Sequence, residues 1–112
     1  MGRIAVAFSP GHISGYFRRV EGSLPSSTGS VGAGVVINEG VRSTVVQAHE
    51  TSVSVVRQGR ASTGSPPVEY ALDRLGVAAR ITTECRLPIG AGFGLSAAAL
   101  LATLTAINHL FD

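Results

Sequence analysis

The sequence has no lysine and only one cysteine, Cys85. A single cysteine excludes an internal disulfide and a cysteine-cluster metal site, so a reducing compartment, the cytoplasm, is expected. The absence of lysine excludes the Walker phosphate loop, which ends in Gly-Lys-Ser/Thr. No apolar run is long enough to form a signal-peptide core or a membrane span.

Charge of one sign is also scarce. The sequence contains 9 basic residues, all of them arginine, and 7 acidic residues, so its net charge is +2. Because the arginines are scattered rather than gathered into a stripe, the chain lacks the electrostatic footprint of a nucleic-acid-binding protein. With 112 residues, 45% of them hydrophobic, it fits one globular domain. We therefore expect neither nucleic acid nor a membrane as a partner.

Short apolar or alternating segments predict strands over residues 3–8, 35–37, 41–48, 52–57 and 77–85. The sequence Asn38-Glu39-Gly40 is typical of a turn, which predicts a hairpin between the second and third of these strands. The glycine-rich residues 29–34 are interpreted as a flexible entry to that hairpin, with ligand contact as the alternative. In the last strand, Cys85 shares its face with Ile81 and Thr83, which indicates a core position.

Two segments have helical character. In the first, Val68, Leu72 and Leu75 recur at helical spacing, Ser65 is a possible N-cap, and Gly76 ends the helix. The second, residues 96–110, contains no glycine or proline and is apolar around nearly its whole circumference, so it is expected to be buried on most sides. These elements predict an α+β fold in which a mixed or antiparallel sheet packs against helices on one side.

The most informative segment is residues 87–99, Leu-Pro-Ile-Gly-Ala-Gly-Phe-Gly-Leu-Ser-Ala-Ala-Ala, between a predicted strand and a predicted helix. Its glycines let backbone N–H groups approach a ligand, and the helix that follows offers unpaired amides and a favourable dipole to phosphate. Ser96 could cap this helix, or reach a phosphate oxygen or a magnesium ion. The dinucleotide fingerprint fails because Leu95 occupies the place of its third glycine. A plain turn between strand and helix is the remaining alternative.

A second segment, residues 8–17, follows the first predicted strand and reads Phe-Ser-Pro-Gly-His-Ile-Ser-Gly-Tyr-Phe. Its hydroxyl and imidazole groups, on Ser9, His12 and Ser14, lie in what we predict to be a loop held by proline and glycine. Such a loop suits the recognition of a small polar substrate. The alternative is that His12 is an ordinary hydrogen-bonded loop residue.

Together the two segments resemble the GHMP kinase superfamily, which combines a Pro-Gly-containing N-terminal motif with a later Pro-x-x-x-Gly-Leu-x-Ser-Ser-Ala loop. The resemblance implies a ribosomal protein S5 domain 2-like fold and ATP- and Mg²⁺-dependent phosphorylation of a small alcohol. It implies triphosphate contacts from Pro88, Gly90, Ala91, Gly92, Gly94, Leu95, Ser96 and Ala97, with Ser96 also contacting the metal. It places Ser9, Gly11, His12 and Ser14 on the substrate side.

The acceptor that the resemblance implies is pantoate or a similar hydroxy acid, giving 4-phosphopantoate for coenzyme A synthesis in archaea. Homoserine, shikimate or a mevalonate-type alcohol is the alternative acceptor, and a non-catalytic S5-like binding module is the alternative function. Two departures from the family loop are Leu95 at a serine position and Phe93 at the leucine position. Complete members also carry a C-terminal domain. We therefore expect residues 1–112 to be an N-terminal domain that lacks the general base and pairs with a missing half or a second copy.

Overall fold

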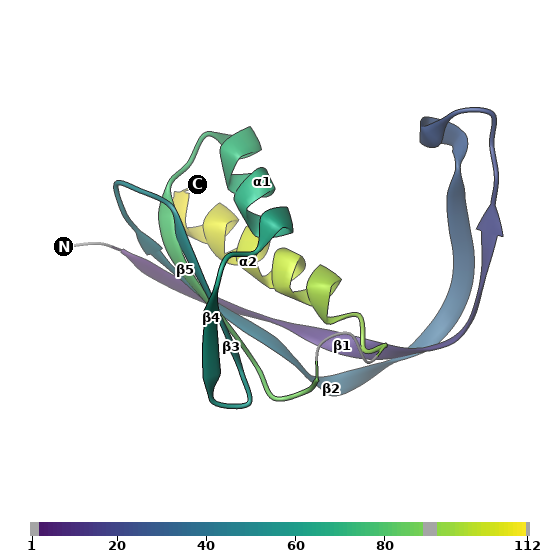
Figure 1. The fold of residues 1–112 in the computed structure, drawn as a ribbon, viewed down its shortest axis with the longest axis horizontal. Coiled ribbons are helices and arrows are strands. Elements are labelled where there is room, and N and C mark those ends of the chain that lie inside the picture. The colour runs from purple at the N-terminus through teal and green to yellow at the C-terminus, as the bar shows by residue number, and fades with distance from the viewer. Residues whose placement is uncertain (1–2, 89–91, 112) are drawn as a thin grey trace.

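The computed structural model describes residues 3–88 and 92–111. It has one five-stranded sheet with both α-helices on the same face (Figure 1), which confirms the predicted α+β fold. The elements, in chain order, are β1 (Ile4–Val20), η1 (Pro25–Ser27), β2 (Gly29–Gln47), β3 (Ser52–Arg57), β4 (Arg60–Thr63), α1 (Pro66–Leu75), β5 (Ala79–Cys85) and α2 (Leu95–Phe111).

The strand order is β1-β2-β5-β3-β4, and every neighbouring pair is antiparallel except the parallel pair β3 and β5. Ile81 in β5 lies between Val45 of β2 and Val53 of β3. All three side chains are buried. The predicted core face of this strand, which includes Cys85, is confirmed. Burial of each such aliphatic side chain stabilises the fold by about 1.5–3 kcal/mol.

Helix α1 begins and ends where the sequence predicted. The backbone N–H of Ser65 donates a 2.7 Å hydrogen bond to Oε2 of Glu69, while the Ser65 hydroxyl caps nothing. Gly76 ends the helix in the left-handed region, with φ of 70°. There its N–H bonds the carbonyl of Asp73 at 3.2 Å. This is the usual glycine stop, since other residues rarely adopt that conformation.

Helix α2 lies on the sheet through a row of small residues, Ala98, Ala102 and Ala106, all of them buried. Its opposite face carries exposed Leu101 and Thr105. The prediction that this helix is buried on most sides is therefore wrong, because the sheet covers only one of its faces. Among the described residues, no helix has the length and hydropathy needed to span a membrane.

Strands β1 and β2 are much longer than predicted, and this corrects three expectations. The predicted loop over residues 8–17 lies within β1, while the predicted turn at residues 38–40 and the flexible entry at residues 29–34 lie within β2. Register shifts occur between Pro10 and His12 and between Ser14 and Tyr16. Proline and glycine at such bulges interrupt the alternation of apolar and polar residues that predicts a strand. The backbone pairing nevertheless continues through them. Strand β4 was not predicted.

The distal halves of β1 and β2, with the loop that joins them, form a two-stranded ribbon that projects from the rest of the molecule (Figure 1). We call residues 12–36 the arm and the remainder the body. No residue of the arm is buried. Its large exposed apolar side chains are Ile13, Tyr16, Phe17, Val20, Leu24, Val31, Val35 and Val36.

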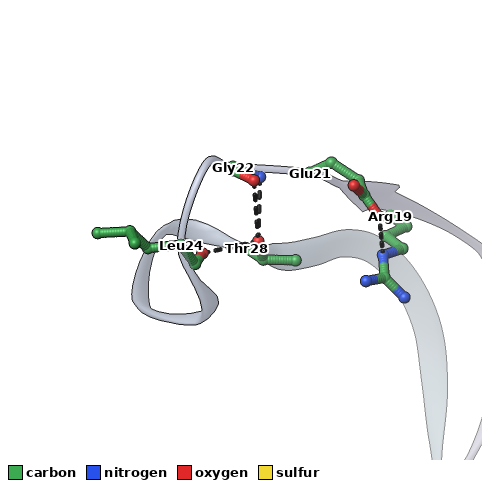
Figure 2. Close-up of polar contacts among 5 residues, drawn as sticks. All are labelled: Arg19, Glu21, Gly22, Leu24 and Thr28. Atoms are coloured by element: carbon green, nitrogen blue, oxygen red, sulfur yellow. Dashed lines mark hydrogen bonds and ion pairs between the residues drawn. The ribbon is translucent and has the colours of Figure 1, made fainter.

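The tip of the arm is closed by polar contacts, shown in Figure 2. The Gly22 N–H donates to Oγ1 of Thr28 at 3.0 Å, and the Thr28 hydroxyl donates to the carbonyl of Leu24 at 2.9 Å. Nearby, Nε of Arg19 lies 3.0 Å from Oε1 of Glu21. The tip is therefore closed by hydrogen bonds and an ion pair although it has no core.

Candidate functional site

The structure brings together the two segments that the sequence singled out. Where β1 passes the beginning of α2, the His12 N–H donates a 2.9 Å hydrogen bond to the carbonyl of Phe93. A Cβ on neighbouring Gly11 would lie 2.8 Å from that same carbonyl oxygen, which is closer than real Cβ atoms come. Glycine at position 11 thus permits the glycine-rich loop to dock on β1.

Gly94 links this junction to the helix. Its φ is 65°, and the His12 imidazole lies so close that a Cβ on Gly94 would collide with the Cε1 and Nδ1 atoms of the ring. The Gly94 carbonyl accepts the Ala98 N–H at 3.1 Å. That is the first hydrogen bond of α2, so Gly94 is the N-cap residue. The interpretation of Ser96 as the helix cap is therefore wrong.

Ser96, in the first turn of α2, is exposed, and its hydroxyl makes no hydrogen bond with any residue in the described ranges. The N–H groups of Leu95, Ser96 and Ala97 have no intrahelical acceptor, as in any first helical turn. No acidic residue occupies this turn. The helix dipole and the free amides therefore favour an anion here.

The predicted substrate-side residues divide into two groups. Ser14 places its Oγ 3.4 Å from Nε2 of His12, and both residues are exposed beside the beginning of α2. Ser9, in contrast, pairs with Val41 and is only 6% exposed. The expectation that Ser9 lies in an open substrate loop is corrected, because strand pairing turns this residue into the layer between sheet and helix.

The predicted phosphate loop is described only in part. Pro88 is exposed at the end of the first described range, while Gly90 and Ala91 lie outside the described residues. Gly92 is exposed, with φ of 90°, and a Cβ at this position would meet no heavy atom within 4 Å. Backbone freedom, rather than close packing, is therefore what glycine supplies at this position.

A cavity of about 240 Å³ adjoins Ser96, between the beginnings of α1 and α2 and the β3–β4 hairpin. It is walled by apolar and polar side chains that include Val55, Arg57, Ser62, Pro66, Thr83 and Ser96. Sequence reasoning did not find this cavity, because its walls come from several separate elements with no common motif.

The described residues hold no cluster of three or more His, Cys, Asp or Glu side chains that could bind a metal ion by itself. A magnesium ion does not require one, since it commonly keeps several waters and is bound through substrate phosphates. The exposed Ser96 hydroxyl is a suitable additional oxygen ligand. Arg18 and Arg19 lie on the arm, where Arg19 pairs with Glu21.

Comparison with known proteins finds similarities to kinases. Residues 62–112 match the family described as "GHMP kinases N terminal domain". A solved structure described as "Phosphotransferase related to CoA biosynthesis pathway" superposes on 98% of this chain and 41% of its own, with a TM-score of 0.78 and 25% identity. The homoserine kinase of Cytophaga hutchinsonii, at 20% identity and a TM-score of 0.63, shares the fold over 97% of this chain and 36% of its own.

In its fold and in these matches, the chain is similar to the N-terminal domain of GHMP kinases. Within this class, the chain is similar to the pantoate kinase of Methanospirillum hungatei JF-1, with 44% identity over 112 aligned positions. The alignment covers 95% of this chain and 39% of that protein, so the chain spans well under half of its relative.

Proposed function

We propose that this chain binds the triphosphate of ATP at the beginning of α2, as part of a kinase that phosphorylates pantoate or a similar hydroxy acid. The observation that carries the proposal is the junction of His12 with Gly94, which places the β1 motif beside free helix amides. The names of the pantoate kinase relative and of the coenzyme A-related phosphotransferase support this choice of acceptor.

In this proposal the phosphates lie against the N–H groups of Leu95, Ser96 and Ala97, with Gly92 and Gly94 allowing close approach. Pro88, Gly90 and Ala91 complete the same loop. The cavity beside Ser96 takes the nucleoside, between its apolar walls and the polar groups of Arg57 and Ser62. An anion at a helix N-terminus needs no cationic side chain, which fits a chain without lysine.

In this proposal, a single side chain of the chain contacts the metal ion. The Ser96 hydroxyl would hold magnesium together with phosphate oxygens and water, and the bound ion would neutralise charge on the transferred phosphoryl group. The protein's own part is to position the phosphates, because phosphoryl transfer depends mainly on alignment and charge stabilisation.

The acceptor would lie on the His12 and Ser14 side, where an imidazole and a hydroxyl are exposed together. Either group can hydrogen-bond the acceptor's hydroxyl or carboxylate. Gly11 acts through the docking of Phe93 rather than by touching the acceptor. The buried Ser9 supports the layer beneath α2.

Calorimetry on the purified chain tests the nucleotide site, with ATP titrated in the presence and absence of magnesium. We expect magnesium-dependent binding that Ser96→Ala and Gly92→Val each weaken about tenfold or more, as for loss of a charge-assisted contact. Thr105→Ala, exposed on the same helix, and Gly59→Val, at another positive φ with open space around it, are the matched controls. Equal loss in the controls, or tight binding in every variant, would contradict the proposed site.

The acceptor is tested by adding pantoate to the chain saturated with magnesium ADP and following the His12 imidazole signals by NMR. Pantoate should shift them, and homoserine, shikimate and mevalonate at the same concentration should not. A shift caused by one of these other alcohols would keep the kinase proposal and replace its acceptor. Steeply salt-dependent binding of RNA with no response to ATP would favour a non-catalytic binding module.

A further inference from the structure

A buried hydroxyl pair joins α2 to the centre of the sheet. The side-chain oxygens of Ser43 in β2 and Thr103 in α2 lie 2.8 Å apart, and both residues are fully buried. Thr103 follows Leu95 by eight residues, which at 1.5 Å per residue places it about 12 Å along the helix from the candidate phosphate site. It does not touch that site.

The middle of α2 packs on the sheet through small side chains, whereas larger buried side chains lie near its ends, at Leu95, Ile107 and Leu110. Ala98, Ala102 and Ala106 carry only methyl groups toward the sheet, so this stretch has no large side chain to lock into a groove. Apolar attraction is also non-directional. A hydrogen bond between two buried hydroxyls is directional, and a small axial shift would leave both groups without a partner. The pair is therefore suited to fix the axial position of the helix.

That position matters because the beginning of α2 is joined directly to β1. The His12 ring lies where a Cβ on Gly94 would be, and the His12 N–H donates a hydrogen bond to the carbonyl of Phe93. An axial shift of α2 of about 1 Å would change both contacts and the direction of the first-turn N–H groups.

We propose that Ser43 and Thr103 are positioning residues, which set the axial register of α2 and so hold its first turn in the geometry that binds phosphate. This inference rests on the proposed function, since it assigns the hydroxyl pair to the same nucleotide site.

Four variants separate positioning from stability: Thr103→Val, Ser43→Ala, the Ser43→Ala/Thr103→Val double variant, and Thr103→Ser. The double variant leaves no unpaired buried hydroxyl, so its unfolding midpoint should stay close to that of the wild type. It should nevertheless bind magnesium ATP about tenfold more weakly, as expected for a misplaced binding geometry. Thr103→Ser loses a buried methyl group and some stability but keeps the hydroxyl, so its affinity should remain within about twofold of the wild type.

Wild-type affinity in the double variant would overturn the inference, and so would an affinity that follows stability across all four variants. A second readout keeps the test independent of the proposed function. If the wild-type chain binds no ATP, the proposed function fails. The NMR signals of the His12 imidazole and the Gly94 amide then test whether the hydroxyl pair sets the axial position of α2. They should move in the double variant but not in Thr103→Ser, with the distant Gly76 amide as control. Unmoved signals would overturn the positioning role.

Discussion

The arm and the body are built from the same two strands, β1 and β2, but they are held in different ways. In the body, alternate side chains are buried on the face that α2 covers, whereas in residues 12–36 no side chain is buried. The radius of gyration, 15.2 Å, exceeds the roughly 13 Å expected for a compact domain of this length, as a projecting arm requires. Backbone pairing alone can therefore extend a strand, while burial supplies the stability.

The largest difference in stability is expected when an isoleucine is replaced by alanine in each region. Ile81→Ala in the body should lower the free energy of unfolding by about 2–5 kcal/mol, because Ile81 is 0% exposed. Ile13→Ala in the arm, where the side chain is 50% exposed, should change it by less than about 0.5 kcal/mol. Urea unfolding followed by circular dichroism measures both. Similar losses would show that the arm is covered in solution.

A smaller effect is expected from a glycine within the arm. A Cβ on Gly34 would lie 2.6 Å from the carbonyl oxygen of Ile13, so Gly34→Ala should destabilise the ribbon locally by about 1–3 kcal/mol. Amide hydrogen exchange should accelerate in the arm and stay unchanged in β5 and α1. Gly29→Ala is the matched control, since nothing lies within 4 Å of its Cβ. Faster exchange throughout the body would mean that the two regions unfold as one unit.

The smallest effect concerns the ion pair of Arg19 and Glu21, whose side chains are 68% and 72% exposed. Exposed pairs contribute little, so Arg19→Gln should change the free energy of unfolding by less than about 0.5 kcal/mol. The change, measured by the same urea unfolding, should vanish at high salt. A larger, salt-resistant loss would indicate that the tip is buried against another surface.

The same division explains how much of the fold the sequence predicted. Strand β5 and helix α1 each bury one face in the core. Their apolar residues therefore recur at strand or helix spacing, as Ile81, Val68 and Leu72 show. Strands β1 and β2 leave the core halfway along, and their pairing in the arm depends on the partner strand rather than on side-chain pattern. The proline and glycines of residues 8–17 therefore resembled a loop in the sequence, although they occupy bulges.

The candidate site was predictable where its chemistry is local. The glycine-rich loop before a helix and the exposed Ser96 follow from short-range rules for helix termini. The contact of His12 with Gly94, the burial of Ser9 and the bond between Ser43 and Thr103 depend on tertiary packing between segments far apart in the chain. No short-range pattern carries that information.

The closed tip of the arm has a consequence for the order of folding. The contacts between Gly22 and Thr28 close a loop within a few residues, and such loops close in about 10–100 ns. The parallel pairing of Ser52 with Arg80 must wait until a much longer segment has been brought back to the sheet. The ribbon can therefore form first, yet an isolated two-stranded hairpin is marginal in water and persists only once the sheet is complete. The part of the chain with the least burial thus has the shortest path to its native pairing.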